Sequence, residues 1–447
     1  MHILIIIGTR PEITKVAPVV FELERKGIPY NIVWTGQHYD YEMSKVFFEE
    51  INLPEPNVYL NLGGDIEVLD KVAFMIRSIR DVIRRIKPIA VYSLGDTATT
   101  LASALASVYE ELPFIHDEAG MRSFDMFMVE EVNRKVADVL ASVHFAPTKL
   151  AYYNLLREGA SKDMVYLTGS TAVDMLISTM PLIKQKSLEI YYNRDYILVT
   201  IHRRENILHL PRLRIIVNFI KKLAEKYTIV FPIHPHTRKK LQEYGLLSML
   251  NEDKIVLSRP MSYIQFMSTM YNSKSVITDS GGVQEEAFIF GKPTITLRKT
   301  TEWPETIILG YNTLIDPDIL KDSLEGYVQK ILNHIEKSTF PPDLVTCPIG
   351  DGHASSRIAK TLKLFAEGVI KIKQINVKID LTNLYYMSVL KNRGFIYFNK
   401  ETGLPTPKDS ICVERGRSGL SQEKLVEFIK VDWETNSESN FSYGLNA

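Results

Sequence analysis

The sequence is poor in cysteine, and its charges of opposite sign balance. Its 447 residues include two cysteines, Cys347 and Cys412, whose separation matches no metal-binding or redox spacing. This usage is typical of a reducing cytosol, in which such thiols are structural or incidental. The 53 basic residues equal the 53 acidic ones, so no global field attracts nucleic acid or an anionic membrane. A local site must therefore bind any anionic ligand.

Long apolar runs and the common cofactor motifs are also missing. Residues 1–7 are apolar, but the run stops at Gly8 without a cleavage pattern, so it is interpreted as a buried first strand. The chain has no P-loop and no G-x-G-x-x-G. His234 and His236 flank a proline away from any carboxylate cluster, which favours loop histidines over metal ligands. We expect a cytoplasmic protein without a membrane span or a metal.

What the sequence does contain is a regular alternation of apolar strands with helical patterns. One series opens at residues 2–7 and a second at residues 196–200. Strands separated by helices indicate right-handed crossovers and open parallel sheets, and the chain is too long for one core. The sequence thus predicts an α/β protein with two parallel-sheet domains. The predicted divisions are residues 1–172, residues 173–350, a helix crossing back within 351–368, and a small α+β appendage of unknown role at 369–447.

The strongest local signal is the stretch TDSGGVQEEA at residues 278–287. It follows an apolar strand and opens a helix, so Ser280, Gly281 and Gly282 fall at a strand-to-helix turn. Two glycines let a phosphate approach the main chain, Ser280 can cap the helix or contact the phosphate, and the helix dipole favours negative charge. Acidic residues 285 and 286, expected in the first turn, leave a carboxylate for ribose hydroxyls. The alternative is an ordinary loop before a helix.

Positive charge follows the opening strand of each series. Arg10 and Lys15 come after residues 2–7, while His202 precedes two arginines after residues 196–200. Side chains at such strand ends can bind a diphosphate, because ligands of open parallel sheets lie at the carboxyl edge. The alternatives are surface charge for the arginine and lysine and a structural role for the histidine.

Three successive strand ends or loops of the first series each supply a carboxylate. Asp96 follows the strand at residues 89–93, Glu118 follows the strand at 113–115, and Glu130 opens the next helix. Taken alone, Asp96 and Glu130 suit helix capping and Glu118 suits a buried ion pair. Their convergence on one sheet edge favours acid and base chemistry.

Six of these motifs together resemble the non-hydrolysing UDP-N-acetylglucosamine 2-epimerases over about residues 1–368. They keep the family's order and spacing: GTRPE at 8–12, GDT at 95–97, EAG at 118–120, EEVNR at 130–134, HRREN at 202–206 and TDSGGVQEEA at 278–287. The resemblance implies a GT-B architecture, with two Rossmann-like domains whose parallel sheets face a cleft. It also implies a homodimer that serves cell-surface polysaccharide biosynthesis.

The resemblance further implies an isomerase that needs no cofactor, neither a metal nor a nicotinamide. Such an enzyme eliminates UDP from UDP-N-acetylglucosamine to give 2-acetamidoglucal, then adds it back to give UDP-N-acetylmannosamine. Catalysis is implied for Asp96, Glu118 and Glu130, with His202 assisting charge separation. The implied substrate contacts are the diphosphate for Arg10, Lys15, His202, Ser280, Gly281 and Gly282, the uracil for Phe266, and the ribose for Glu286.

The sequence departs from this family at several places. Asp117 stands where a hydrophobic residue is usual, and Trp303 where an arginine is usual. A tryptophan there resembles the branch acting on UDP-2,3-diacetamido uronic acids, which makes that sugar an alternative substrate. The family's second, regulatory UDP-sugar site has two glutamines, of which this chain keeps Gln37 but has Asp40 at the second position. We therefore expect no activation by substrate.

Two other classes of function remain open. A GT-B glycosyltransferase would share the cleft and the nucleotide motif, but would not need three converging carboxylates. A UDP-sugar sensor would keep the phosphate site and lose the acid and base groups.

Overall fold

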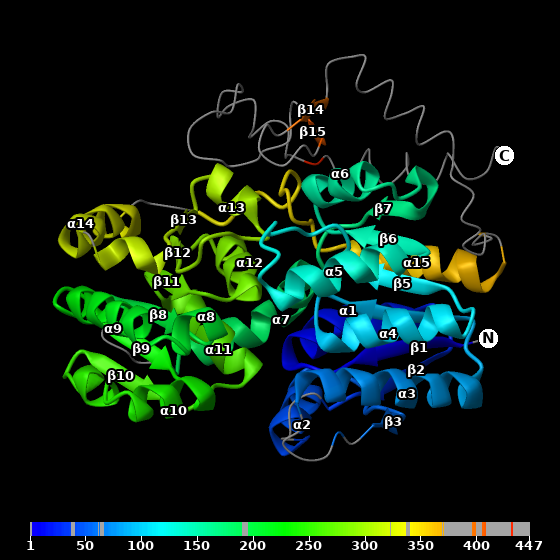
Figure 1. The fold of residues 1–447 in the computed structure, drawn as a ribbon, viewed down its shortest axis with the longest axis horizontal. Coiled ribbons are helices and arrows are strands. Elements are labelled where there is room, and N and C mark those ends of the chain that lie inside the picture. Colours follow the sequence, from blue (N-terminus) through cyan, green and yellow to red (C-terminus); the bar gives the residue numbers. More distant parts are fainter. Residues whose placement is uncertain are drawn as a thin grey trace.

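The chain forms two lobes, each built on a parallel sheet covered by helices (Figure 1). The computed structural model describes residues 2–36, 41–60, 62, 67–189, 195–321, 323–336, 340–368, 370, 396–398, 405–407 and 431. Gln37, Asp40, Cys412 and most of the predicted appendage at 369–447 lie outside these residues. The strands described in the appendage, β14 (Ile396–Phe398) and β15 (Pro405–Pro407), pair antiparallel.

The first lobe contains a seven-stranded sheet in the order β3-β2-β1-β4-β5-β6-β7, and all its neighbouring strands run parallel. Its strands are β1 (Ile3–Ile7), β2 (Tyr30–Trp34), β3 (Val58–Tyr59), β4 (Ala90–Leu94), β5 (Phe114–Asp117), β6 (Val143–Ala146) and β7 (Val165–Leu167). The helices between them are α1 (Arg10–Arg25), α2 (Tyr41–Glu50), α3 (Val68–Ile86), α4 (Ala98–Tyr109), α5 (Val129–Leu140), α6 (Lys149–Arg157) and the short η1 (Lys162–Met164).

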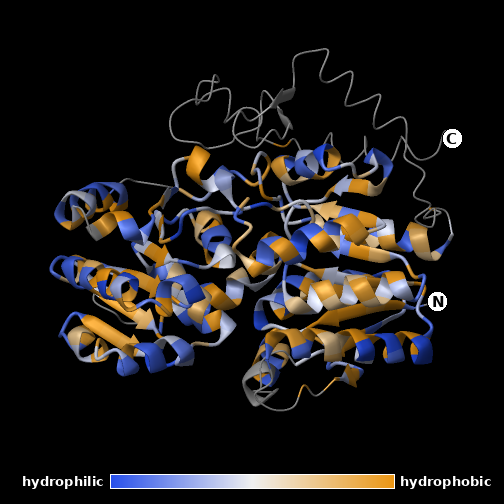
Figure 2. Ribbon diagram, viewed as in Figure 1, coloured by the Kyte–Doolittle hydropathy of each residue, from blue (hydrophilic) through white to orange (hydrophobic). Residues whose placement is uncertain are grey.

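The continuous apolar run of β1 is explained by helices on both faces of the sheet. Ile3, Ile5 and Ile7 belong to one buried cluster, whereas Leu4 and Ile6 belong to another. Successive strand side chains point to opposite faces, so a strand covered on both sides needs apolar residues at every position. Figure 2 shows the same distribution, with hydrophobic strands inside and polar helix faces outside.

The second lobe contains a six-stranded parallel sheet in the order β10-β9-β8-β11-β12-β13. Its strands are β8 (Tyr196–Thr200), β9 (Thr228–Pro232), β10 (Ile255–Ser258), β11 (Ser275–Thr278), β12 (Thr294–Thr296) and β13 (Asn312–Leu314). Its helices are α8 (Arg204–Ile207), α9 (Leu210–Ala224), α10 (Pro235–Glu243), η2 (Leu247–Leu250), α11 (Tyr263–Asn272), α12 (Gly281–Ile289), α13 (Pro304–Ile308), η3 (Pro317–Lys321) and α14 (Leu324–Ile335).

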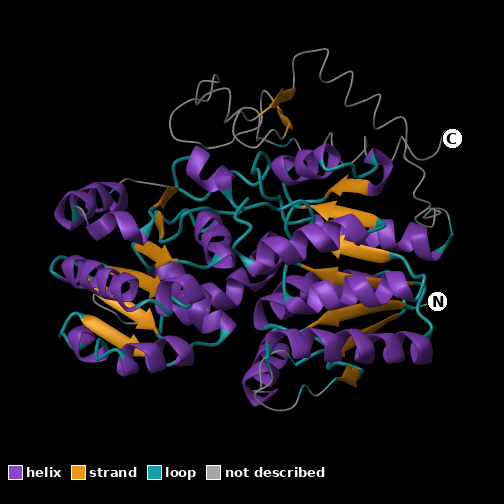
Figure 3. Cartoon of the chain, in the orientation of Figure 1, coloured by secondary structure: helices purple, strands orange, loops and turns teal. Residues whose placement is uncertain are grey.

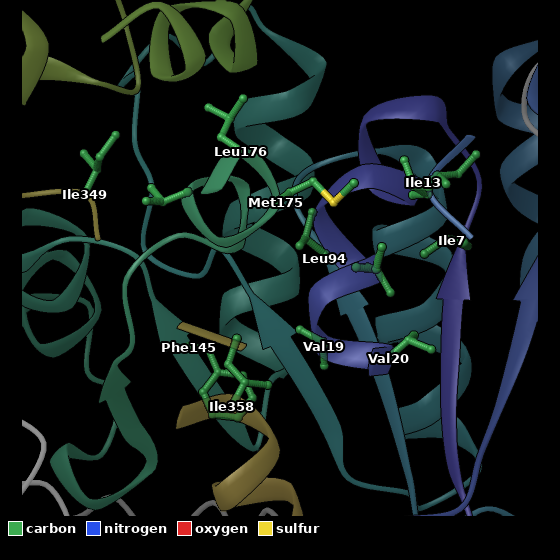
Figure 4. Close-up of a cluster of buried hydrophobic side chains, with 14 of the residues drawn as sticks. Ile7, Ile13, Val19, Val20, Leu94, Phe145, Met175, Leu176, Ile349 and Ile358 are labelled. Carbon is green, nitrogen blue, oxygen red and sulfur yellow. The ribbon is translucent and has the colours of Figure 1, made fainter. Parts of the chain in front are cut away.

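Two helices join the lobes, α7 (Thr171–Ser187) and α15 (Ala354–Ala366). Helix α7 packs against α1 of the first lobe and α11 of the second, and α15 returns to pack on α1 and α7. Met175 on α7 and Ile358 on α15 belong to the cluster that includes Phe145 of the first sheet (Figure 4). The carboxylate of Asp174 caps α15 by accepting the N–H of Ser355 at 2.7 Å. The lobes are therefore joined by a packed core.

The carboxyl ends of the two sheets point toward each other (Figure 3). Polar residues that follow a strand in one lobe consequently meet those of the other lobe. None of the helices in the described part of the chain is both long and apolar enough to cross a bilayer.

Candidate functional site

The glycine turn between β11 and α12 is open toward the space between the sheets. Helix α12 begins at Gly281, with Ser280 at the N-cap position, but the Ser280 side chain makes no cap hydrogen bond. A Cβ built on Gly282 would meet nothing within 4 Å, whereas one on Gly281 would lie 3.4 Å from Oε2 of Glu302. The first N–H groups of a helix lack intrahelical partners, so this turn can bind an anion through its main chain.

One sequence expectation about this helix is wrong. Glu285 and Glu286 were expected in the first turn of α12, but the helix begins at Gly281 and has no acidic residue in that turn. Glu285 is fully buried. For Glu286, burial and the neighbouring Glu285 charge raise the pKa to about 8.

The turn after β8 is fixed to the glycine turn by a buried carboxylate. Asp279 accepts the N–H groups of His202 at 3.1 Å and Arg203 at 3.0 Å, and the side-chain amide of Asn206 at 3.0 Å. Strands β8 and β11 are neighbours, which places Asp279 directly beside His202. The His202 side chain is 45% exposed, and its Nδ1 lies 3.4 Å from Oδ1 of Asp279. The imidazole is thus anchored at its backbone and free to meet a ligand.

Asp96 and Glu118 lie side by side, after the neighbouring strands β4 and β5. A Cβ on Gly95 would stand 3.5 Å from Oε2 of Glu118. Asp96 forms an ion pair with Arg134, and its main-chain carbonyl accepts the amide of Asn133 at 2.9 Å. The helix-capping alternative does not apply to Asp96, because Thr97 is the residue that caps α4.

Lys15 connects Glu118 to the second lobe. Its ammonium forms an ion pair with Glu118 and lies 3.1 Å from Oε2 of Glu285 on α12. Burial disfavours the Lys15 cation, but the charges of Glu118 and Glu285 outweigh burial and raise the pKa of Lys15. For Glu118, burial raises the pKa while Lys15 opposes that rise. The buried ion pair considered for Glu118 is therefore present, and it spans both lobes.

A second ionic connection between the lobes surrounds Glu302. This buried carboxylate accepts two hydrogen bonds from Arg298, at 2.6 and 2.9 Å, and lies 3.4 Å from Nη2 of Arg134. Burial disfavours its charge, but Arg298 and Arg134 hold the pKa of Glu302 well below its usual range. Glu130, at the start of α5, lies 3.7 Å from Nη1 of Arg203, and Nη2 of the same arginine lies 3.8 Å from Oε1 of Glu302. Arg134 itself forms ion pairs with both Asp96 of the first lobe and Glu302 of the second.

The remaining predicted residues lie on helices around this centre. Phe266 is half-buried on α11 and packs against the large core cluster. The charge of Glu286 raises the pKa of Tyr263 on the same helix, after the larger effect of burial, so Glu286 faces α11. The guanidinium of Arg10 stands over the ring of Phe47, 5.4 Å from its centroid. Lys15, Asp96 and Glu118 are brought together, with Glu130 linked to them through arginines.

Sequence reasoning gave no role to Arg134 or Glu302, although both lie inside or beside quoted motifs, and it considered Glu285 for the ribose rather than for Lys15. The one local signal was the i,i+3 spacing of Glu131 and Arg134, whose side chains pair at 2.8 Å. In the described part of the chain, no three His, Cys, Asp or Glu residues are grouped to hold a metal ion. The site consists instead of paired carboxylates and cations facing an open helix N-terminus.

Comparison with known proteins gives a consistent result. A sequence model of the UDP-N-acetylglucosamine 2-epimerase family matches residues 22–363. The UDP-N-acetylglucosamine 2-epimerase of Methanocaldococcus jannaschii is 39% identical over 371 residues, which cover 81% of this chain and 99% of the relative. The UDP-2,3-diacetamido-2,3-dideoxy-D-glucuronate 2-epimerase of Pseudomonas aeruginosa is 35% identical over 370 residues, covering 81% and 99%.

A solved structure also resembles this chain. The M. jannaschii UDP-GlcNAc 2-epimerase in complex with UDP-GlcNAc and UDP matches with a TM-score of 0.75 and 37% identity, over 81% of this chain and 99% of that one. The predicted pair of Rossmann-like domains in a GT-B arrangement is confirmed by this likeness and by the two parallel sheets.

Proposed function

The chain belongs to the UDP-N-acetylglucosamine 2-epimerase family, and from this premise we propose that it interconverts UDP-N-acetylglucosamine and UDP-N-acetylmannosamine. It is an enzyme of the isomerase class. One observation supports the proposal most directly: Lys15 links Glu118, at the edge of the first sheet, to Glu285 on α12, the helix that opens with the glycine turn. A nucleotide diphosphate at that turn would place its sugar beside the carboxylates.

The chemistry of this reaction requires both halves of the site. The hydrogen on the second sugar carbon is weakly acidic, so a fixed carboxylate must remove it as the bond from C1 to the diphosphate oxygen breaks. The electrons of the broken C–H bond form the C1–C2 double bond of 2-acetamidoglucal, and UDP leaves with the electrons of its bond. Proton delivery to the opposite face and re-addition of UDP complete the inversion.

We assign the acid and base roles to Asp96, Glu118 and Glu130. Asp96 and Glu118 lie on neighbouring strand ends, and Glu130 reaches the same region through Arg203. The ion pairs place a cation beside Glu118 and another beside Asp96, and Lys15 opposes the rise that burial causes in the pKa of Glu118. His202 would assist charge separation, because its exposed ring stands beside the glycine turn.

We assign UDP mainly to the second lobe. Ser280, Gly281 and Gly282 would hold the diphosphate with their main chain, as the open space above Gly282 allows. Phe266 would pack on the uracil, and Glu286 would accept ribose hydroxyls. Arg10 and Lys15 would add positive charge from α1 of the first lobe, so the bound nucleotide would contact both lobes.

A second sugar is favoured by Trp303. This side chain is 3% exposed, and its Nε1 would lie 3.9 Å from a Cβ on Gly281, so it forms a wall of the glycine turn in place of an arginine. A UDP-2,3-diacetamido uronic acid carries its own carboxylate and a second acetamido group. It is therefore the alternative substrate for the same elimination and re-addition.

We also propose the wider setting of the enzyme. The division at residues 172 and 173 is supported by the positions of the sheets, which end at Leu167 and begin again at Tyr196. A cytoplasmic location is supported by the scarcity of cysteine. The homodimer, and a place in cell-surface polysaccharide biosynthesis, rest on the family resemblance.

The decisive experiment is turnover in deuterated water. Purified protein is incubated with UDP-N-acetylglucosamine and, separately, with the UDP-diacetamido uronic acid, and the sugars are examined by NMR and mass spectrometry. Deuterium at C2 of both epimers without any acceptor is the expected result. Transfer of the sugar only when an acceptor is added would show a glycosyltransferase instead, and UDP binding without exchange would show a sensor.

A further inference from the structure

Glu118 has an unusual backbone for a residue at the centre of a site. Its φ is +59°, in the left-handed region that residues other than glycine rarely adopt. Backbone hydrogen bonds on both sides of Glu118 continue the sheet pattern. The N–H of Gly95 donates to the carbonyl of Asp117 at 3.0 Å, and the N–H of Ala119 donates to the carbonyl of Phe145 at 3.0 Å. The N–H of Glu118 instead donates to Oδ1 of Asp117 at 2.8 Å. The side chain of Asp117 thus accepts the hydrogen bond of the Glu118 N–H, which does not bond to a neighbouring strand here.

Asp117 is itself held from the next strand. Its side chain lies in the core of the first lobe, 2% exposed, and its Oδ2 accepts the hydroxyl of Tyr92 at 2.5 Å. Tyr92 is fully buried on β4, the strand that ends beside Asp96. Burying a carboxylate and a hydroxyl is unfavourable unless they form a hydrogen bond with each other. Such a costly buried pair indicates a specific structural role. Asp117 connects this pair to the site through the hydrogen bond that it accepts from the backbone N–H of Glu118.

We propose that Asp117, fixed by the Tyr92 hydroxyl, is a positioning residue that holds Glu118 in its left-handed conformation and so directs the Glu118 carboxylate toward Lys15 and the reacting carbon. This inference deepens the proposed function and rests on it. Asp117 does not touch the substrate in this scheme. It acts on the direction and the proton affinity of its neighbour.

The pair is also placed to make turnover depend on pH. Burial raises the pKa of Asp117 to about 7, and the charge of Glu118 adds to this rise. The Tyr92 hydroxyl, the backbone N–H of Glu118 and His116 oppose it. Tyr92 lies on β4, His116 lies on β5, and Glu118 follows β5 directly. The pKa of Glu118 responds in turn to the charges of Lys15, Glu285 and Asp96. The ionised carboxylate is the stronger acceptor for both donors and increases the proton affinity of Glu118. Turnover should therefore rise as pH passes through about 7 from below.

The experiment compares kcat and KM from about pH 5.5 to 9 for the intact chain and three variants. Asp117→Asn keeps an oxygen for the Glu118 amide but cannot ionise, and Tyr92→Phe removes the donor that favours ionisation. Ser93→Ala is the matched control, because Ser93 is also buried on β4 and bonds the carbonyl of Ile6 at 3.0 Å on the other side of the strand. Thermal unfolding and UDP binding are measured for each protein.

We expect the rise in kcat near pH 7 to vanish in Asp117→Asn, with kcat at pH 8 lower by roughly tenfold and KM little changed, as for a loss of aim rather than of binding. In Tyr92→Phe the rise should move to higher pH, and in Ser93→Ala it should stay in place even if stability falls. A profile shared by the intact chain, Asp117→Asn and Tyr92→Phe would overturn the inference while leaving the proposed function intact. Absence of turnover by the intact chain on both sugars would overturn the proposed function, and this inference with it.

Discussion

The carboxyl ends of the two sheets are built in opposite ways. At the edge of the first sheet, the proposed functional groups are the side chains of Asp96 and Glu118, and each is paired with a cation. At the edge of the second sheet, the open groups belong to the main chain at Gly281 and Gly282, and the buried carboxylate of Asp279 serves as the scaffold. In the proposed site, the carboxylates of the first lobe would face the ligand, whereas Asp279 in the second lobe bonds the protein.

This difference matches the two tasks of an epimerase. Proton transfer needs titratable groups whose pKa values are adjustable, and ion pairs at the first edge provide that control. Holding a diphosphate needs donors that keep their charge distribution at every pH, and backbone N–H groups provide it. The cations of the first edge extend across the gap, since Lys15 reaches Glu285 and Arg134 reaches Glu302. We infer that proton transfer at the first edge and nucleotide binding at the second are coupled through these two ion pairs.

The largest effect should come from removing a carboxylate at the first edge. We expect Asp96→Asn or Glu118→Gln to lower kcat by roughly a hundredfold or more, the contribution of a lost general acid or base. UDP binding should persist, because the second edge is untouched. The control is Glu22→Gln, which removes a carboxylate paired with Arg25 on the outer part of α1. The measurements are steady-state rates and calorimetric UDP titrations of each variant. Near-normal turnover in both Asp96→Asn and Glu118→Gln would contradict the acid and base roles assigned to these residues.

Asp279 tests the scaffold role of the carboxylate at the second edge. Asp279→Asn replaces one of the two accepting oxygens with an NH2 group, which cannot accept a hydrogen bond from these N–H donors. We therefore expect the free energy of unfolding to fall by about 3 kcal/mol. The turn carrying His202 should loosen, which would weaken UDP as well. The matched control is Asp253→Asn on an exposed loop of the same lobe. Denaturant unfolding curves that coincide for the two variants would show that Asp279 is not the anchor.

The strand and helix pattern of the sequence predicted much of this fold. The apolar run at Ile3–Ile7 and the strand before Ser280 are observed as β1 and β11, because a strand covered on both faces must be apolar throughout. The helix expected within residues 351–368 is observed as α15 (Ala354–Ala366). These features depend on local periodicity, which a single sequence displays.

The pairing of charges was beyond the sequence. Lys15 and Glu285 are far apart in the chain, as are Arg134 and Glu302, and no local pattern connects them. The burial of Glu285 was also missed, because placing it in the first turn depended on a helix that started after Gly282, whereas α12 begins at Gly281. Asp117 was noticed as an extra carboxylate, but its bond to Tyr92 needed the register of β4 and β5. Long-range geometry decides such contacts.

The pH dependence of stability sharpens the comparison, because each edge contains a carboxyl with a raised pKa. Burial, opposed by the bonds of Thr97 and Gly8, raises the pKa of Glu12 to about 7, and burial with Glu285 raises that of Glu286 to about 8. Between the unfolded value of 4.5 and these values the folded chain binds more protons, so stability should fall as pH rises through that window. Each group contributes a slope of at most about 1.4 kcal/mol per pH unit.

Glu12→Gln and Glu286→Gln should each flatten this decline, the first up to about pH 7 and the second up to about pH 8. The control Glu55→Gln lies on the surface and should leave the curve unchanged. Unfolding midpoints measured at half-unit steps of pH provide the comparison. A stability that rises with pH over this range in the intact chain would contradict the assignment of both carboxyls.

The smallest effect is expected at the two glycines, where the main-chain role of the second edge can be broken by one methyl group. In Gly282→Ala the Cβ enters open space in a helical turn, so the free protein should gain about 0.4–1 kcal/mol of stability through the unfolded chain. Gly281→Ala should gain less, because its Cβ would stand 3.4 Å from Oε2 of the Glu302 carboxylate, which leaves little spare room. Both methyl groups would obstruct a diphosphate, and the loss of one charge-assisted bond should weaken UDP by roughly tenfold. Unfolding curves and UDP titrations separate the two effects. If Gly282→Ala is more stable and binds UDP as the intact chain does, the diphosphate does not lie on this turn.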